Sequence, residues 1–435
     1  MELLRITGGA PLRGEVSISG SKNATLPVMA AALLSDEPVE LLNVPDIEDI
    51  DTMAEMIRHL GVEVRRLARG RWLVSATEVA TVDVGAQLTR RLRGSFLLLG
   101  ALVARTGEAR IARPGGDDIG MRRVEQHLEG LRHMGAEVRE EDDMYVARSS
   151  GLRGARIDLD MPTVTGTENL MMAAVLAEGI TVISNAAREP HVVDLARCLM
   201  GMGAYIDGAG SDRVVIEGTG GALLHGTRHS VTPDYIEAGT YMVASAATHG
   251  DVVAERMRPS DVRWLIHKLR AAGCSVVEGS SHVRVSAGPL RSVDVTTWPH
   301  PGFATDLQSQ YVALMTQAEG TSIVSEAVFE NRFHHVRELR KFGADVTEEG
   351  RSAIIRGPTA LVGTTAGVPD IRSGAALVIA ALCADGVSEL ESIYHLHRGY
   401  EDLERKLCSL GARVDRVSTE GSHHPPRDFS GVVGD

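Results

Sequence analysis

The sequence predicts an α/β protein of two domains, built from six copies of one unit of roughly 70 residues. Three observations predict this fold class. A helix that ends in glycine recurs six times, an alanine-rich helix followed by a β-branched strand recurs with the same period, and a polar break near residues 226–233 separates two groups of three units. The chain has 435 residues, which exceeds the usual size of a single hydrophobic core.

The first pattern is a helix that ends in glycine and is followed by a short alternating strand. It reads RHLGVEV, RHMGAEV, MGMGAYI, RAAGCSV, RKFGADV and CSLGARV. The glycines are Gly61, Gly135, Gly203, Gly273, Gly343 and Gly411. We expect each to adopt the left-handed backbone conformation that closes a helix.

The second pattern is an alanine-rich helix, a small turn and a β-branched strand. It reads AALLSDEPVELLNV, ALVARTGEARIARP, AAVLAEGITVISNA, ASAATHGDVVAERM, LMTQAEGTSIVSEA and AALCADGVSELESI. Its turns fall at Glu37, Gly107, Gly179, Gly250, Gly320 and Gly386. Two independent anchors with one period indicate that each unit alternates strands with two helices.

Composition restricts the class of protein. Hydrophobic residues make up 43% of the chain and charged residues 24%, as in ordinary globular proteins. No apolar run approaches the ~20 residues that span a bilayer, and the start MELLRITGGA does not resemble a signal peptide. The four cysteines lack metal-ligand spacing, so we expect reduced thiols in a cytoplasmic protein. The net charge of −13 disfavours nucleic acid, and an anionic ligand would need a local cluster of cations.

Polar or charged residues recur where the alanine-rich helices are expected to begin. They are Lys22 with Asn23, Arg93, Thr165 to Thr167, Glu237, Asp306 and Arg372. Capping of the helix explains the threonines, Asn23 and Asp306. It does not explain the cations, because a positive charge at a helix N-terminus opposes the helix dipole. A helix N-terminus with a lysine or arginine favours an anion site at these positions.

Further candidate cations lie in expected loops. Arg122 and Arg123 follow ARPGGDDIGM, Arg332 lies in VFENRFHH, and Arg398 lies in YHLHRGYED. A single loop arginine is usually solvated, so only the combination indicates a site for anions.

Several motifs resemble those of one family. GEVSISGSKNATLPVMAAALL, LRGSFLLLGALVARTG, ARPGGDDIGMRRVEQHLEGL, PTVTGTENLMMAAVLAEG, PHPGFATDLQSQ, VFENRFHHVREL and YHLHRGYEDLERKL are similar to the UDP-N-acetylglucosamine 1-carboxyvinyltransferases, which are enolpyruvyl transferases. The resemblance extends from about residue 3 to residue 415 in order. The 5-enolpyruvylshikimate-3-phosphate synthases, which share the six-repeat fold, match much less well.

The resemblance implies an inside-out α/β barrel in two domains. The first domain would span residues 22–232 and carry the loop with the PGGD sequence, and the second would combine residues 1–21 with 233–420. The polar tail 421–435 is expected to be disordered. The implied reaction transfers the enolpyruvyl group of phosphoenolpyruvate to UDP-N-acetylglucosamine and releases phosphate, in peptidoglycan precursor synthesis. It needs no cofactor and no metal, and both substrates are small molecules.

The resemblance also implies roles for residues. Asp117 would be the acid and Asp306 the base, assisted by Lys22 and Arg398. Phosphoenolpyruvate would be bound by Lys22, Asn23, Arg122, Arg332, Arg372 and Arg398. The nucleotide sugar would be bound by Asn23, Arg93, Arg122, Arg123, Val124, Glu125, Gln126, Thr163, Thr165, Thr305, Asp306 and Val328.

The main departure from the family lies in the PGG loop. Most members carry cysteine where this chain has Asp117, and the antibiotic fosfomycin alkylates that cysteine. A carboxylate is a far poorer nucleophile than a thiolate, so we expect insensitivity to fosfomycin. Arg123 and Glu125 replace the proline and aspartate that are frequent in the family, Met161 replaces a lysine, and Tyr235 replaces an arginine.

These departures leave alternatives open. Arg123 and Glu125 are compatible with a paralogue that acts on another nucleotide. The absent cysteine is compatible with an inactive sensor of the nucleotide sugar, although a sensor would not need a clamp for phosphoenolpyruvate.

Overall fold

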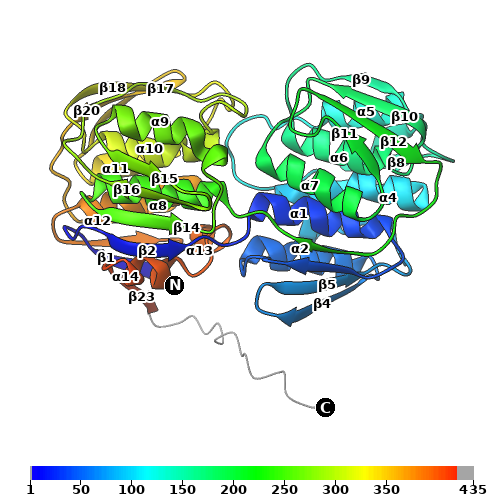
Figure 1. Ribbon diagram of the computed structural model, residues 1–435, viewed down its shortest axis with the longest axis horizontal. Helices are drawn as coiled ribbons and strands as arrows, with labels where there is room; N and C mark the ends of the chain where they lie inside the picture. Colours follow the sequence, from blue (N-terminus) through cyan, green and yellow to red (C-terminus); the bar gives the residue numbers. More distant parts are fainter. Residues whose placement is uncertain (1, 419–435) are drawn as a thin grey trace, which may run out of the picture.

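The computed structural model describes residues 2–418 as two halves that lie side by side (Figure 1). Each half has its own hydrophobic core. One core contains buried residues from Ala24 to Val231, and the other combines the segment Leu4 to Ile18 with residues from Tyr235 onward. The chain crosses between the halves twice, and the crossings pair with each other: Ser21 N donates to Thr232 O at 2.8 Å and Asp234 N donates to Ser19 O at 2.9 Å. The crossings lie at residues 19–21 and 232–234.

Within the described residues the strands form six sheets, one for each repeat. In the first domain, one sheet contains β3 (Val39–Leu42), β4 (Glu63–Ala68), β5 (Arg71–Ser75) and β13 (Thr227–Ser230). The next contains β6 (Glu108–Ala112), β7 (Glu137–Glu141) and β8 (Met144–Arg148). The third contains β9 (Arg156–Asp158), β10 (Glu178–Ser184), β11 (Tyr205–Asp207) and β12 (Arg213–Thr219). In the second domain, one sheet contains β2 (Arg13–Ser17), β14 (Asp251–Glu255), β15 (Ser275–Glu278) and β16 (His282–Ser286). The next contains β17 (Val295–Thr296), β18 (Gly320–Ser325), β19 (Asp345–Glu349) and β20 (Ser352–Gly357). The last contains β1 (Glu2–Thr7), β21 (Thr365–Gly367), β22 (Val387–Glu391) and β23 (Arg413–Ser418).

The sheets share one pairing scheme. A parallel pair at one edge, such as β9 with β10, is followed by two antiparallel pairs, β10 with β12 and β12 with β11. In the last sheet β1 occupies the interior position, antiparallel to both β22 and β23. In the three-stranded sheet an isolated parallel bridge between Asp83 and Arg110 stands where the edge strand would be. The common scheme supports the six repeats that the sequence predicts.

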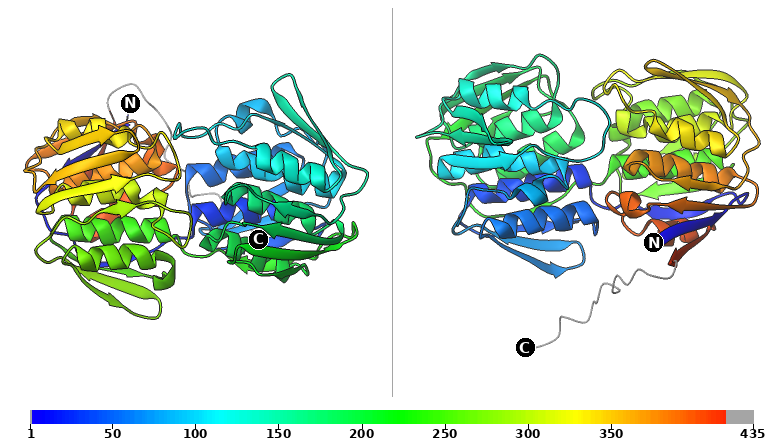
Figure 2. Two further views of the ribbon diagram at one scale, coloured as in Figure 1. Left: turned by 90° about the horizontal axis from the view of Figure 1, so that it is seen from above. Right: turned by 180° about the vertical axis from the view of Figure 1, so that it is seen from behind.

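The first helix of each repeat lies inside its domain, with the sheets and the second helices around it (Figure 2). These inner helices are α1 (Lys22–Ala31), α4 (Leu98–Thr106), α6 (Val164–Ala174), α8 (Tyr235–Ala247), α10 (Gln308–Met315) and α12 (Ile371–Cys383). Short 3-10 segments adjoin three of them, η1 (Ala32–Leu34), η2 (Arg93–Leu97) and η4 (Thr305–Leu307). Every residue of α8 and α10 is buried, and small side chains such as alanine allow this close packing.

The second helices cover the outside of each domain. They are α2 (Glu48–His59), α5 (Glu125–His133), α7 (Pro190–Gly201), α9 (Arg263–Ala271) after η3 (Pro259–Val262), α11 (His334–Lys341) and α14 (Leu403–Ser409), with the short α3 (Ala86–Thr89) and α13 (Tyr394–His397) beside them. The helices α2, α5, α9, α11 and α14 carry basic residues in the last turn, which suits the helix dipole.

The expectation about the glycines that end these helices is confirmed. Their φ angles lie between 85° and 100°, in the left-handed region that glycine adopts without steric cost. One segment differs from the expectation: residues 227–230, which the sequence marks as a polar break, form β13 and pair in parallel with β3. Neither face of this strand is fully buried, so its sequence lacks the alternation of apolar and polar residues that predicts a strand. The tail 421–435 lies outside the described residues. Among residues 2–418 we find no helix with the length and apolar character that a membrane span requires.

Candidate active site

Three of the residues singled out from the sequence, Lys22, Asp117 and Arg398, lie where the two domains meet. Arg398 of the second domain is only 6% exposed and bonds two carboxylates of the first domain. Its Nε donates to Asp49 Oδ1 at 2.9 Å, and its Nη1 donates to Asp117 Oδ1 at 2.5 Å. Lys22 Nζ, at the first residue of α1, lies 3.2 Å from Asp49 Oδ2. Lys22, Asp49, Asp117 and Arg398 thus form one cluster of alternating charge, called here the Asp117 cluster.

The charges of this cluster keep Asp117 ionised. Burial raises the pKa of Asp117, but the positive charges of Arg398 and Lys22 outweigh it and hold the pKa below its ordinary value. The two carboxylates have the opposite effect on Arg398: burial lowers its pKa, and the charges of Asp49 and Asp117 raise it well above the ordinary value.

A second cluster surrounds Asp306, which lies in η4 ahead of α10. Asp306 accepts a hydrogen bond from Arg332 and one of 2.8 Å from Arg372 Nη2, and both arginines are buried. Arg332 Nη1 also donates to Thr305 Oγ1 at 2.9 Å. Burial raises the pKa of Asp306, yet Arg372 and Arg332 lower it far below its usual range. We call Thr305, Asp306, Arg332 and Arg372 the Asp306 cluster.

Phe329 lies between two of the cations. The guanidinium of Arg122 lies 5.9 Å from the centre of its ring and that of Arg332 lies 5.2 Å away, within cation–π range. Arg93, the first residue of η2, donates to the carbonyl oxygen of Arg122. Arg122 therefore links the PGG loop of the first domain to the Asp306 cluster of the second.

Arg93 and Arg122 differ from the other cations because neither forms an ion pair within residues 2–418. Burial and the charge of Arg122 lower the pKa of Arg93 to about 10. Burial and the charge of Arg332 lower the pKa of Arg122 below its ordinary value. Two half-buried cations without a carboxylate would be stabilised by an anionic ligand between them.

The PGG loop passes close to the start of η2. A Cβ atom on Gly115 would lie 1.7 Å from the carbonyl oxygen of Arg90, and one on Gly116, whose φ is 107°, would lie 2.9 Å from Arg93 Cβ. Only glycine fits at these two positions. The loop is then bonded to the second domain, where His334 Nε2 donates to Asp118 O at 2.8 Å and Asn331 N donates to Ile119 O at 3.2 Å.

The residues expected at the nucleotide lie around the starts of α5 and α6. Thr163 caps α6 by accepting from Gly166 N at 3.3 Å. Thr165 Oγ1 lies 3.3 Å from Nε2 of the buried His127, whose pKa is lowered to about 3 by burial. Gln126 Oε1 accepts from Met161 N at 3.5 Å. These contacts form a polar wall beside Arg93 and Arg122.

The remaining expected residues have weaker ties to the two clusters. Asn23 is half-buried beside Lys22, Val124 is buried at the start of α5, and Arg123 and Glu125 are exposed. Val328 contributes a backbone N–H, which donates to Glu326 at 2.8 Å. No group of three or more His, Cys, Asp or Glu side chains with metal-site geometry occurs within residues 2–418. All four cysteines are unpaired.

Sequence reasoning missed several members of the site. Asp49 bonds both Lys22 and Arg398, but an acidic residue in the first turn of a helix is also the ordinary complement to the helix dipole. Glu326 accepts from Thr305, Thr297 and the N–H groups of residues 328 and 329, and so orders the turn that carries Phe329. Neither residue has a sequence signal that separates it from a surface carboxylate.

Comparison with known proteins identifies the family. The family model described as EPSP synthase (3-phosphoshikimate 1-carboxyvinyltransferase) matches residues 6–407. A protein of Magnetococcus marinus named UDP-N-acetylglucosamine 1-carboxyvinyltransferase is 46% identical over 419 residues, which cover 96% of this chain and all of that protein.

Solved structures agree on the fold. The enolpyruvyl transferase NikO from Streptomyces tendae superposes with a TM-score of 0.87 at 28% identity, covering 96% of this chain and 99% of that one. An EPSP synthase from Acinetobacter baumannii has a TM-score of 0.74 at 18% identity, covering 96% of this chain and 100% of its own, and shows the fold alone. The six-repeat, two-domain α/β architecture expected from the sequence is confirmed. The chain is an enzyme that belongs to the enolpyruvyl transferase family.

Proposed function

We propose that the protein transfers the enolpyruvyl group of phosphoenolpyruvate to the 3-hydroxyl of UDP-N-acetylglucosamine and releases phosphate by addition and elimination. One observation carries the proposal. Arg398 joins Asp117 across the domains while Arg332 and Arg372 flank Asp306, so a candidate acid and a candidate base are each paired with buried arginines. The name of the Magnetococcus marinus relative supports this choice of substrate.

The two clusters divide the anionic groups of phosphoenolpyruvate between them. Its phosphate would bind Lys22, Arg122 and Arg398, and its carboxylate would bind Arg332, Arg372 and Arg398. An arginine fork fits a planar carboxylate with two parallel hydrogen bonds. The diphosphate of the nucleotide would neutralise Arg93 and the segment from Arg122 to Gln126, Thr163 and Thr165 would line the uridine, and Asn23, Thr305, Asp306 and Val328 would face the sugar.

Substrate binding would also prepare the acid and the base. In the unliganded protein the pKa values of Asp117 and Asp306 are both low because arginines neutralise them. When the substrate anions take over those arginines, both pKa values rise. Asp306 then becomes a stronger base for the sugar hydroxyl. Asp117 can hold the proton that it gives to the methylene carbon, which becomes a methyl group in the intermediate. The methyl group then loses one proton as phosphate leaves, and this restores the double bond.

The wider role follows from the reaction. Transfer of enolpyruvate to UDP-N-acetylglucosamine would place the enzyme in the cytoplasm at the first committed step of peptidoglycan precursor synthesis, and so in cell-wall biogenesis, cell shape and division. Asp117 in place of cysteine would make the enzyme resistant to fosfomycin.

A phosphate-release assay tests the proposal with UDP-N-acetylglucosamine and UMP as alternative acceptors. Wild type and Asp117→Cys are compared with and without fosfomycin. We expect turnover with UDP-N-acetylglucosamine in both, and time-dependent inactivation only in Asp117→Cys, where Arg398 and Lys22 favour the thiolate. A fosfomycin adduct mapped to Asp117 of the wild-type protein would contradict the predicted resistance.

The same assay addresses the alternatives. Preference for UMP would favour a paralogue with another acceptor, a reading supported by the exposed Arg123 and Glu125 in the nucleotide loop. Nucleotide binding without turnover would favour a sensor.

A further inference from the structure

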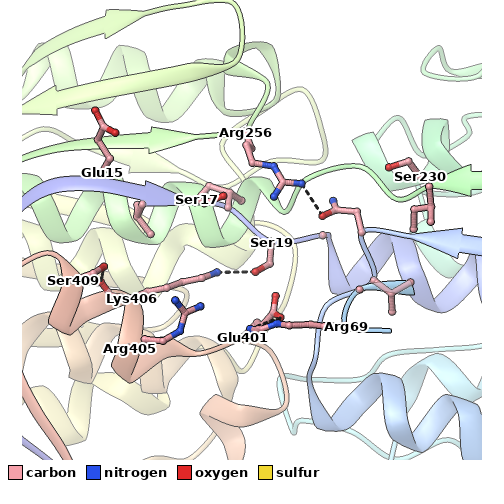
Figure 3. A pocket seen from close by; sticks show the side chains of 17 residues that line it. Glu15, Ser17, Ser19, Arg69, Ser230, Arg256, Glu401, Arg405, Lys406 and Ser409 are labelled. Atoms are coloured by element: carbon pink, nitrogen blue, oxygen red, sulfur yellow. Dashed lines mark hydrogen bonds and ion pairs between the residues drawn. The ribbon is translucent and has the colours of Figure 1, made fainter. Parts of the chain in front are cut away.

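A cavity of about 610 Å³ lies at the two crossings between the domains, outside the two clusters described above. The crossing strand, residues 15–20, forms one wall. Asn43 and Arg69 line the cavity from the first domain, and Arg256, Arg405 and Lys406 line it from the second (Figure 3). Its volume lies in the range of small-molecule sites, which is roughly 300–1,000 Å³.

The arginines around this cavity retain free hydrogen-bond donors. Arg69 and Arg405 both bond Asp402, and Arg69 also bonds Glu401. These bonds use Nε and Nη2 of each guanidinium, so Nη1 of both is unused within residues 2–418. Of the two carboxylates in the lining, Glu401 is thus occupied by Arg69, and the exposed Glu15 points away from the arginines in Figure 3.

Arg256 is the cation without a carboxylate. Its Nη2 donates to Asn43 Oδ1 at 3.3 Å, and none of its contacts within residues 2–418 is an ion pair. Its φ is 57°, a left-handed value that disfavours residues other than glycine, asparagine and aspartate.

Three other repeats also have a residue with positive φ directly after the equivalent strand. These residues are Asn43 after β3, Asn185 after β10 and Ser392 after β22. Asparagine adopts this conformation readily, whereas arginine does so at a steric cost. A cation is therefore placed over the cavity at a backbone position that favours asparagine, and strain of this kind is typical of functional sites.

We propose that this cavity binds a small molecule bearing a phosphate group, held by Arg256, Arg405 and Arg69. Arginine forks bind phosphate oxygens through several N–H groups at once. Because Arg69 belongs to one domain and Arg405 to the other, a bound phosphate would hold the domains in one relative orientation. The site is separate from the proposed phosphoenolpyruvate clamp and does not depend on the proposed function.

Hydrogen–deuterium exchange of the full chain, with pyrophosphate as the probe, tests the proposal because it shows where the anion binds. We expect exchange to slow several-fold in residues 252–260 and 401–409 of wild type. This protection should be lost in the double variant Arg256→Gln, Arg405→Gln. It should persist in Arg372→Gln, the matched control that removes a cation from the Asp306 cluster.

Ser230→Glu separates binding from folding, because it keeps every cation and adds a carboxylate to the cavity lining. Loss of protection in this variant, with an unchanged melting temperature, supports the site even if the double variant fails to fold. Three results would overturn the proposal: protection of these segments in Ser230→Glu equal to wild type, protection confined to the segments of the Asp117 and Asp306 clusters, or protection by citrate but not by pyrophosphate.

Discussion

Arg398 is the residue on which the proposed acid depends, since it bonds Asp49 and Asp117 at the same time. A phosphate that binds Arg398 and Lys22 would weaken the interaction of Arg398 with Asp117. The pKa of Asp117, which lies below its ordinary value in the unliganded protein, would then rise.

A rise in this pKa predicts that phosphoenolpyruvate binding takes up protons. Uptake is expected between the lower pKa of the free enzyme and the higher pKa of the complex, so it should be small at pH 8 and grow toward about one proton as the pH falls. Calorimetry in buffers of different ionisation enthalpy measures it.

Asp117→Asn is the matched control, because it keeps the size of the side chain and cannot take up the proton. The difference in proton uptake between wild type and Asp117→Asn gives the protons taken up by Asp117, because protonation of the ligand phosphate contributes to both measurements. Equal proton uptake in both would exclude Asp117 as the group that is protonated. Turnover in Asp117→Asn should fall by about 100-fold or more if the side chain is the acid.

At this scale, cations were easier to predict from the sequence than carboxylates. Lys22, Arg93 and Arg372 oppose the dipole of the helix that they begin, so their presence needed an explanation. Asp49 and Glu326 have no local feature that distinguishes them from other carboxylates. Only the fold reveals that Asp49 bonds Lys22, 27 positions away, and the more distant Arg398. Glu326 likewise bonds Thr305, 21 positions away. The role of Phe329 between two guanidiniums depends on contacts between domains and was equally hidden.

At the scale of elements, the PGG loop is bonded to the second domain by few contacts, of which His334 to Asp118 O is one. Removal of this hydrogen bond in His334→Ala should cost about 1 kcal/mol and make the detached loop about fivefold more populated. Tryptic cleavage after Arg122 or Arg123 should accelerate by a similar factor. His225→Ala changes an exposed histidine of the first domain and should leave the rate unchanged, and an equal rate in both variants would show that the contact does not hold the loop.

The packing of inner helices gives a second prediction. A Cβ atom on Gly100 of α4 would lie 2.1 Å from Asn169 Oδ1 of α6, which accepts a hydrogen bond from Gly100 N. Gly100→Ala should therefore lower the free energy of unfolding by about 1–3 kcal/mol, measured by denaturant titration.

Gly367→Ala is the control, because a Cβ atom there meets no atom within 4 Å. It should be close to neutral. If both substitutions have the same effect, then loss of glycine flexibility, and not the approach of α4 to α6, explains the change.

Elements were predicted well where periodicity was strong. The inner helices and the glycines that end the outer helices recur in every repeat, so each copy supports the others. The strand β13 was missed because its burial pattern lacks full alternation, and it is held by its parallel register with β3. Long-range pairing of this kind is not encoded in the local sequence.

At the scale of the whole molecule, the two hydrophobic cores share no residue. The first core is formed within residues 24–231, and the return strand β13 pairs with β3 of the same domain. A fragment of residues 20–233 should therefore fold alone and unfold in one cooperative thermal transition. Circular dichroism measures it, and a fragment without a cooperative transition would show that the first domain depends on the second.

The interior position of β1 in the last sheet has a consequence for folding during synthesis. Residues 2–7 leave the ribosome before the other strands described here, yet their two neighbours in the sheet are β22 and β23, at residues 387–391 and 413–418. The second domain cannot complete its core until nearly the whole chain has emerged, whereas the first domain has all its strands by residue 230. Domains generally fold as units in the order of synthesis. The amino-terminal strand must therefore remain without its sheet partners through the folding of an entire domain, and the charge of the exposed Arg5 would help to keep it soluble during that time.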